Sequence, residues 1–207
     1  QPEDTIAYRF TLAEAKSLFF NVVGDRYNAV LKRLDGNDGT LFSNSLSSSD
    51  MHSLLRMDAG TYELRLSPNS RDLSSTLGTY NIQLQDVSAL PILTMDTPAV
   101  GATTQSRLSN EWRFDGIAGT RLLIDPRLTT GSNDQYIYWS LVDAYGTVVS
   151  SNSKWSSNDN AWTVVLPQDG TYVLHLHGQE SSTTARSTTM NVRATTTRTA
   201  GLQLGDV

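Results

Sequence analysis

An internal repeat is the feature of this sequence that most constrains its fold. Each of three segments returns later in the chain, in the same order and with growing spacing. Tyr8-Arg-Phe10 returns as Trp112-Arg-Phe114 after 104 residues, Leu34–Thr40 as Leu141–Thr147 after 107, and Asp58–Tyr62 as Gln168–Tyr172 after 110. An offset that grows by three residues at a time is how small loop insertions behave. The repeat therefore predicts two copies of one structural unit.

The two copies set the expected domain boundaries. We expect a first repeat over residues 1–90, a second over residues 91–197, and the start of a third repeat or a linker over residues 198–207. The last assignment rests on Leu202–Val207, which resembles Leu93–Pro98 at an offset of 109. On this pattern, the chain is expected to be part of a longer array of repeats.

Alternating hydrophobicity predicts strands within each copy. The run Tyr172–His177 alternates between large apolar residues and smaller or more polar ones, and Tyr62–Ser67 repeats the pattern. Because successive side chains on a strand point to opposite faces, each run should have one buried and one solvated face. The chain also has 24 Ser, 24 Thr, and 16 Asp against 5 Glu, a balance typical of strands and turns. We predict an all-β chain of two tandem antiparallel β-sandwich domains of jelly-roll type.

Composition argues against several classes of function. The chain has no Cys, so it has no disulfide, thiol nucleophile or thiolate metal ligand. Its net charge of −5 without a basic block argues against a nucleic-acid partner. Its apolar runs are far shorter than the ~20 residues of a membrane helix, so we expect no membrane insertion. No signal peptide opens the chain, so either one was removed or the chain is an internal fragment.

Motifs of catalysis are missing from the sequence. It contains no Gly-x-Ser-x-Gly, no His-Glu-x-x-His and no phosphate-binding loop. A Ser/His/Asp set can be drawn from any chain with this many serines, so residue types alone indicate nothing. We therefore expect no catalytic residues and no enzyme activity.

Two histidines share one predicted strand face. His175 and His177 have a spacing that could chelate zinc. Their counterparts in the first copy are Arg65 and Ser67, opposite the buried Tyr/Leu/Leu face, so the pattern assigns both histidines to the solvent side. A zinc site also needs further ligands, and the sequence offers none at a recognisable spacing. We therefore expect no metal site at these histidines and no cofactor. Calcium binding elsewhere in the chain is the alternative.

The segment Asp35–Gly39 resembles part of a calcium-binding loop. A full loop has Asp-x-Asp/Asn-x-Asp/Asn-Gly and a distant Glu, but here the spacing is one short and no Glu follows at the right distance. The second copy has Asp143–Gly146 at this place, which would make a poor calcium loop. We favour a hairpin turn, because Asn and Asp tolerate left-handed backbone and Gly provides it. The acidic excess leaves calcium binding by separate loops as an alternative.

All four tryptophans lie in the second copy. Trp112 and Trp139 occupy strand positions that predict burial in the core. Trp155 follows Ser153-Lys in a polar Ser/Asn segment, and Trp162 aligns with His52 of the first copy. The second copy therefore carries aromatic residues at positions where the repeated strand pattern does not require them.

Exposed aromatic rings among Asn, Asp and Ser are typical of a sugar-stacking site. The alternative is that the rings fold back and cap the edge of the sandwich. If the chain binds a ligand, we expect Trp155 and Trp162 to contact it, with Tyr145 or Tyr136 nearby.

The repeated motifs resemble the bacterial pre-peptidase C-terminal domain and its relatives in very large secreted repeat proteins. The family pattern is Tyr-x-Phe-x-Leu, then Asp-x-x-Gly, then Ala-Gly-Thr-Tyr-x-Leu-x-Leu, then Gly-x-Tyr-x-Leu. In the first copy the matching segments are Tyr8–Leu12, Leu34–Gly39, Ala59–Leu66 and Gly78–Leu84. The second copy departs from the pattern in its last strand, where Ser187–Met190 replaces Gly-x-Tyr.

The resemblance implies a role as well as a fold. Such modules are non-catalytic accessories of secreted enzymes or stacked units of adhesins, and some relatives bind calcium or polymeric substrates. We therefore expect a structural or adhesive repeat module of a large secreted or cell-surface bacterial protein, extracellular and monomeric. Its expected partners are neighbouring repeats of the same chain and, in the adhesive case, a surface polysaccharide. The alternatives are a carbohydrate-binding accessory module of a secreted hydrolase and a calcium-stabilised spacer.

Overall fold

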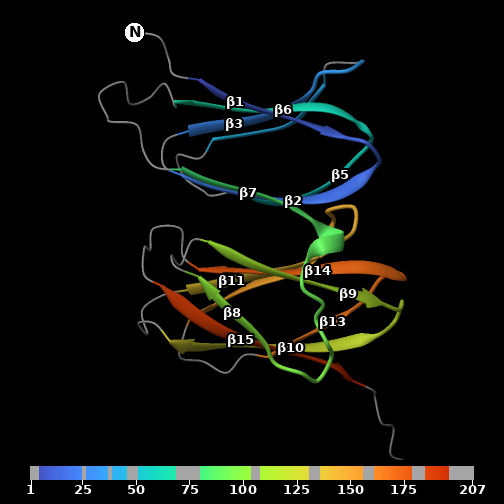
Figure 1. Cartoon of the computed structure of the whole chain (residues 1–207). Coiled ribbons are helices and arrows are strands. Elements are labelled where there is room, and N and C mark those ends of the chain that lie inside the picture. Colours follow the sequence, from blue (N-terminus) through green and yellow to red (C-terminus); the bar gives the residue numbers. More distant parts are fainter. Residues whose placement is uncertain are drawn as a thin grey trace, which may run out of the picture.

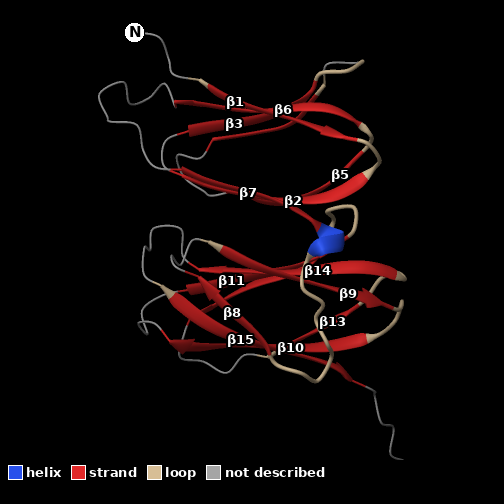
Figure 2. Ribbon diagram, in the orientation of Figure 1, coloured by secondary structure: helices blue, strands red, loops and turns tan. Residues whose placement is uncertain are grey.

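The structure, a computed structural model, describes most of the chain. The described residues are 5–24, 27–36, 39–45, 51–68, 80–103, 108–130, 136–155, 161–178 and 185–195. They form fifteen strands and one short 3-10 helix, arranged as two antiparallel β-sandwiches (Figures 1 and 2). The predicted fold class is confirmed. None of these residues belongs to a helix long and apolar enough to cross a membrane.

The first sandwich is built from sheets A and B. Sheet A has the strand order β1-β6-β3-β4, and sheet B has the order β5-β2-β7. The strands are β1 (Ile6–Leu12), β2 (Lys16–Gly24), β3 (Tyr27–Arg33), β4 (Thr40–Ser45), β5 (Met51–Met57), β6 (Gly60–Pro68) and β7 (Tyr80–Asp86).

The second sandwich is built from sheets C and D and follows the 3-10 helix η1 (Val87–Ala89). Sheet C has the order β12-β11-β14-β9, and sheet D has the order β13-β10-β15-β8. The strands are β8 (Ala99–Thr103), β9 (Ser109–Gly116), β10 (Arg121–Thr130), β11 (Tyr136–Asp143), β12 (Val148–Trp155), β13 (Trp162–Val165), β14 (Gly170–Gly178) and β15 (Arg186–Thr195).

The two sandwiches have the same topology. Strands β1, β6, β3 and β4 of sheet A correspond in order and pairing to β9, β14, β11 and β12 of sheet C. Strands β5, β2 and β7 of sheet B correspond to β13, β10 and β15 of sheet D, which carries β8 as an additional edge strand. The repeat seen in the sequence is therefore a structural duplication. The predicted boundary between residues 90 and 91 follows directly after η1, whereas residues 198–207 lie outside the described residues.

Equivalent tyrosines lie in the same environment in both copies. Tyr62 and Tyr172 are 1% and 0% exposed. Each hydroxyl donates to the backbone carbonyl four residues earlier, at 2.8 Å and 2.6 Å. Each ring also stacks on a phenylalanine of the neighbouring strand, Phe10 or Phe114, with centroids 5.6 Å apart. The Gly-Thr-Tyr segment thus buries the tyrosine ring in the core, and the preceding turn provides the hydrogen-bond acceptor for the tyrosine hydroxyl.

Two segments that sequence analysis compared with calcium loops lie between antiparallel strands. The segment Asp35–Gly39 lies between the antiparallel strands β3 and β4, with Gly36 at φ 95°, although Asn37 and Asp38 lie outside the described residues. In the second copy the Asp143 carboxylate accepts backbone N–H bonds from Tyr145 and Thr147, both at 2.9 Å. The second-copy segment is therefore a hairpin turn, whereas the choice between a turn and a calcium loop at Asp35–Gly39 stays a prediction.

Each sandwich has its own apolar core between its two sheets. The largest buried side chains of the first core are Tyr62, Phe20, Leu31 and Leu66, and those of the second are Tyr172, Leu122, Ile124, Leu141, Leu166 and Leu174. Trp112 and Trp139 are 6% and 3% exposed and belong to the second core, as predicted.

A third apolar cluster joins the two sandwiches. It consists of Phe19, Leu54, Val87, Leu90, Val142 and Val173, which come from sheet B, from η1 with the residue that follows it, and from sheet C. We call this region, where the outer faces of sheets B and C meet, the junction. Figure 1 shows the result, four layers of sheet in the order A, B, C, D.

The β11–β12 turn brings backbone of the two sandwiches into contact at the junction. Ser17 Oγ donates to the carbonyl oxygen of Ala144 at 2.7 Å. Gly146 has φ 88°, and a Cβ at this position would lie 2.2 Å from the carbonyl oxygen of Leu54. Both the left-handed conformation and the close approach require glycine here.

Candidate functional site

The three histidines of the chain meet at the junction. His52 lies on β5 of sheet B, whereas His175 and His177 lie on β14 of sheet C. One ring nitrogen from each lies within 4.8 Å of those from the other two. On β14 the residues Tyr172, Leu174 and Leu176 fill the second core, so the alternating residues are directed out of the sandwich and toward sheet B.

The prediction that His175 and His177 face solvent is wrong. His175 is only 4% exposed and His177 is half-buried. The period-2 pattern correctly identified the face opposite the core, but it carries no information about what covers that face. The third imidazole comes from the other copy, at His52, so no local spacing could have revealed it. The one available sign was that the chain has just three histidines.

The imidazoles form part of a continuous row of ring contacts, some stacked and some tilted. The His52 ring lies next to both others, with centroids 4.9 Å from His175 and 4.3 Å from His177, and the latter two are 5.0 Å apart. Phe19 extends the row beyond His175 at 5.0 Å, and Tyr138 extends it beyond His177 at 5.2 Å. Phe19 and His52 come from the first sandwich and His175, His177 and Tyr138 from the second, so these ring contacts contribute to the contact between the sandwiches.

Hydrogen bonds fix the proton position on one imidazole. His177 Nδ1 lies 2.9 Å from the carbonyl oxygen of Gly178. A carbonyl oxygen only accepts, so Nδ1 carries the proton and the Nε2 of the neutral ring carries a lone pair. His175 Nδ1 lies 3.2 Å from Ser140 Oγ, and its buried Nε2 has no hydrogen-bond partner among the described residues.

Burial keeps both imidazoles of β14 neutral. It lowers the pKa of His175 well below the usual value of 6.5, and the neighbouring imidazoles of His52 and His177 lower it further. Burial also lowers the pKa of His177 to about 4, although its bond to Gly178 acts in the opposite direction. The desolvated ring disfavours the charged form in both cases. At neutral pH His175 and His177 are therefore imidazole rather than imidazolium.

A buried acid lies beside this cluster. Glu111 on β9 is the register partner of His175 and is 6% exposed. Burial raises the pKa of its carboxyl group to about 7. The outer face of sheet C therefore combines imidazoles and a carboxyl group in a region largely closed to solvent.

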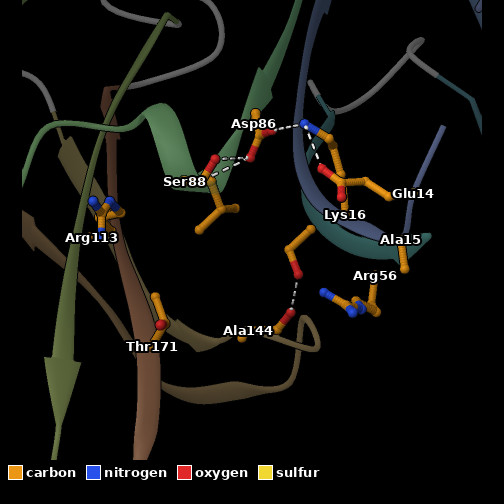
Figure 3. Close-up of a pocket in the computed structure, with 11 residues that line it drawn as sticks. Glu14, Ala15, Lys16, Arg56, Asp86, Ser88, Arg113, Ala144 and Thr171 are labelled. Atoms are coloured by element: carbon orange, nitrogen blue, oxygen red, sulfur yellow. Dashed lines mark hydrogen bonds and ion pairs between the residues drawn. The ribbon is translucent and has the colours of Figure 1, made fainter. Parts of the chain in front are cut away.

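A polar cleft opens at the side of the junction (Figure 3). Its volume is about 370 Å³, and both sandwiches contribute to its lining. Lys16 Nζ lies 2.8 Å from Asp86 and 3.8 Å from Glu14, and Asp86 also accepts bonds from the backbone N–H and hydroxyl of Ser88 at 2.9 Å and 2.7 Å. The Lys16 bond, with help from Ser88, lowers the pKa of Asp86 to about 2. Asp86 thus holds the start of η1 to the first sandwich.

The first sandwich has a groove that the sequence pattern did not predict. It has a volume of about 510 Å³ and is lined by Tyr8, Arg9, Phe10, Leu64, Asn81, Ile82 and Leu84. Sheet B ends at β7, whereas sheet D continues to β8, so this edge lacks the strand that covers its counterpart within the described residues. Tyr8 and Leu84 are accordingly 43% and 40% exposed.

Trp162 does not occupy the position that sequence alignment gave it. Its register partner is Ile124, a core residue, and it packs against the second core next to Trp139. His52, with which it was aligned, faces the junction instead. Trp162 is therefore half-buried inside the second sandwich, and its placement corresponds to the edge-capping alternative.

The structure brings together two of the four predicted ligand-binding residues. Trp155 and Tyr136 are register partners at one end of the β11–β12 hairpin, although their side chains lie outside the described set. Tyr145 is 68% exposed in the turn at the opposite end of this hairpin. Tyr145 thus lies apart from Trp155 and Tyr136 along the hairpin, while a site formed by Trp155 and Trp162 with Tyr136 nearby stays a prediction.

Comparisons with known proteins give distant structural neighbours. No family model matches the sequence, and no curated protein matches it. A periplasmic inhibitor of g-type lysozyme from Aeromonas hydrophila is 13% identical, with a TM-score of 0.35 over 50% of this chain and 95% of its own. The CBM22 tandem domain of Paenibacillus barcinonensis Xyn10C is 10% identical, with a TM-score of 0.33 over 90% and 82%.

A third structure contains a catalytic domain as well. It is the M60 catalytic domain with the CBM51-1 and CBM51-2 domains of Clostridium perfringens ZmpB, 8% identical, with a TM-score of 0.28 over 92% of this chain and 34% of that one. None of the three is described as a pre-peptidase C-terminal domain, so that resemblance stays a prediction.

Acidification should remove the contribution of Asp86 to stability. Its pKa is about 2 in the folded chain and 3.8 as the ordinary value, so the contribution is present above about pH 4 and is lost as the pH falls through 2. Asp86→Asn keeps a capping oxygen but loses the charge. We expect it to lower the unfolding free energy by about 1 kcal/mol at pH 7, since the pair is partly exposed.

Urea denaturation at pH 7, 4 and 2 measures this effect. The difference between Asp86→Asn and wild type should shrink with acid and vanish near pH 2, while Asp58→Asn, at an exposed carboxyl group, should differ little from wild type at each pH. A difference that is constant from pH 7 to 2 would show that the ion pair with Lys16 contributes nothing.

Proposed function

We propose that this chain is a non-catalytic structural module, in which two β-sandwich repeats are held at a fixed relative orientation. The observation that carries this proposal is the apolar cluster at the junction. Val173 is 0% exposed and Phe19 is 2% exposed, although both lie on strand faces directed away from their own cores. Domains joined by a linker move relative to each other unless the interface between them is apolar and well packed. The six buried apolar residues of the junction support such an interface.

Polar and steric contacts support the same orientation. The Ser17–Ala144 hydrogen bond and the approach of Gly146 to Leu54 join backbone segments, and the row of ring contacts includes side chains of both sandwiches. A rigid pair of sandwiches suits a spacer that sets the distance between other parts of a protein. We infer that the parent protein is secreted or exposed on a cell surface, in line with the resemblance to pre-peptidase C-terminal repeats.

The geometry of the junction also suits an array. Sheet B of the first copy packs on sheet C of the second, and sheet C corresponds to sheet A. The contact is therefore head-to-tail, and the same operation would place a further copy on sheet D. This supports neighbouring repeats of the same chain as the partners of this module.

Opening the junction should separate the two sandwiches without unfolding them. Val173→Asp introduces a charge into the buried junction, at a cost of about 3 kcal/mol or more, and that cost is relieved when the junction opens. Val165→Asp is the matched control, because Val165 lies on sheet D and is 47% exposed. We expect Val173→Asp to increase the radius of gyration measured by small-angle X-ray scattering and to split one unfolding transition into two.

The control should scatter and unfold like wild type. The proposal fails if wild-type scattering already requires two independently moving bodies. It also fails if Val173→Asp leaves both the scattering and the single transition unchanged.

A second candidate function is carbohydrate binding, as in an accessory module of a secreted hydrolase. The specific observation in its favour is the register pairing of Trp155 with Tyr136, which sets two aromatic residues side by side at the end of a hairpin. A stacking contact contributes about 1 kcal/mol, so one module would bind weakly and affinity would come from several copies.

Polysaccharide pull-down tests this candidate. Trp155→Ala should reduce retention about fivefold, the equivalent of ~1 kcal/mol per contact. Tyr145→Ala, at the other end of the same hairpin, is the control and should be retained like wild type. Binding that survives Trp155→Ala unchanged, or no binding to any polysaccharide, leaves the structural role alone.

A further inference from the structure

The geometry points to a zinc site formed by His52, His175 and His177, which would bridge the two sandwiches across the junction. All three histidines of the chain converge there from two strands of different repeats, with ring nitrogens within 4.8 Å of one another. The inference rests on the junction described for the proposed function, and it adds a ligand of stated chemistry to that junction.

Two of the three imidazoles already offer a suitable donor atom. The Nδ1 proton of His177 is held by the Gly178 carbonyl, which leaves the lone pair on Nε2. Metal-bound histidines commonly donate their other ring N–H in this way, since it fixes the tautomer and the ring orientation. His175 has Ser140 at Nδ1 and a buried Nε2 without a hydrogen-bond partner among the described residues. A bound cation would satisfy that nitrogen, which otherwise loses its hydration at a cost.

Zinc binding requires the imidazole rings to turn so that their ring nitrogens converge on one point. Zinc binds imidazole nitrogen at about 2.0–2.1 Å in tetrahedral geometry, which places two ligand nitrogens ~3.3 Å apart. The nitrogens lie within 4.8 Å of one another, so they must approach by about 1.5 Å as the rings turn to reach the tetrahedral spacing. A water molecule or another oxygen ligand would take the fourth position, as is usual when three histidines hold zinc.

The donor set selects the class of metal. Three imidazoles, without thiolate in a chain that has no Cys, suit borderline cations such as zinc. Calcium and magnesium prefer oxygen ligands. Burial keeps His175 and His177 in the neutral form that binds metal.

The site is particular to this junction and is not a general property of the repeat. The residues of the first copy that correspond to His175 and His177 are Arg65 and Ser67. Arg65 is exposed and pairs with Glu63. A metal site that occurs at one junction would stabilise that junction selectively, because a ligand that binds only the closed arrangement shifts the equilibrium toward it.

Zinc titration of the chain without an affinity tag tests the inference. Isothermal calorimetry should give one zinc per chain with a micromolar or tighter Kd. His52→Gln, His175→Gln and His177→Gln should each weaken binding at least tenfold. Tyr138→Phe, which keeps the ring beside His177, is the control and should bind like wild type. Circular dichroism without metal establishes that each variant is folded.

Wild-type protein alone provides a second measurement in case a variant misfolds. Addition of Co²⁺ should produce the visible absorption of a tetrahedral site, and zinc should raise the unfolding midpoint while the same concentration of Mg²⁺ should not. The inference is overturned if folded wild type binds no zinc, or if His52→Gln binds as tightly as wild type. Small-angle scattering separates the two proposals. If the protein binds no zinc but its scattering shows a closed junction, the metal site is wrong and the structural role stands.

Discussion

Phe19 on β2 and Val173 on β14 lie on strand faces that point away from their own cores, and they pack together in the space between the sandwiches. This contact buries the second face of both strands. A β-sandwich normally exposes the outer faces of its two sheets, so each of these sheets has one more buried face than the isolated fold requires. The relative orientation of the sandwiches, the burial of the histidines and the approach of Gly146 to Leu54 all depend on it.

The duplicated fold shows how one position adapts to different surroundings. Val173 of sheet C corresponds to Glu63 of sheet A. Glu63 is 2% exposed, and ion pairs with Arg9 and Arg65 at 2.8 Å and 2.7 Å lower the pKa of its carboxyl group. Val173 instead lies in the apolar junction. The backbone repeat is thus retained, while the outer faces have diverged between an ion-paired surface and an apolar contact.

Much of the fold could be predicted from the sequence. The recurrence of Gly-Thr-Tyr at Tyr62 and Tyr172, with alternation along the following strand, indicated the duplicated sandwich, because buried core positions impose a period that is visible in a single sequence. The Asp35 and Asp143 segments predicted turns for a local reason, the backbone preferences of Asp, Asn and Gly. Both features depend on residues close in the chain.

The junction could not be predicted in the same way. Its contacts join residues far apart in the chain, such as His52 and His175, and alternation does not show whether a second sheet covers the outer face. One indication that a second sheet covers the outer face was the mostly apolar run Leu18-Phe-Phe-Asn-Val-Val23. Strands that are buried on both faces lose the alternation of apolar and polar residues. Trp162 was misplaced because alignment by offset ignored a local shift of register between β5 and β13.

We propose that the two sandwiches form one rigid four-layer body. Residual dipolar couplings of the backbone amides in weakly aligned wild-type protein test it most directly. A rigid body aligns as one unit, so couplings from both sandwiches should fit a single alignment tensor with the relative orientation shown in Figure 1. Two tensors of different magnitude for the two sandwiches would mean that they move independently, and would contradict the account.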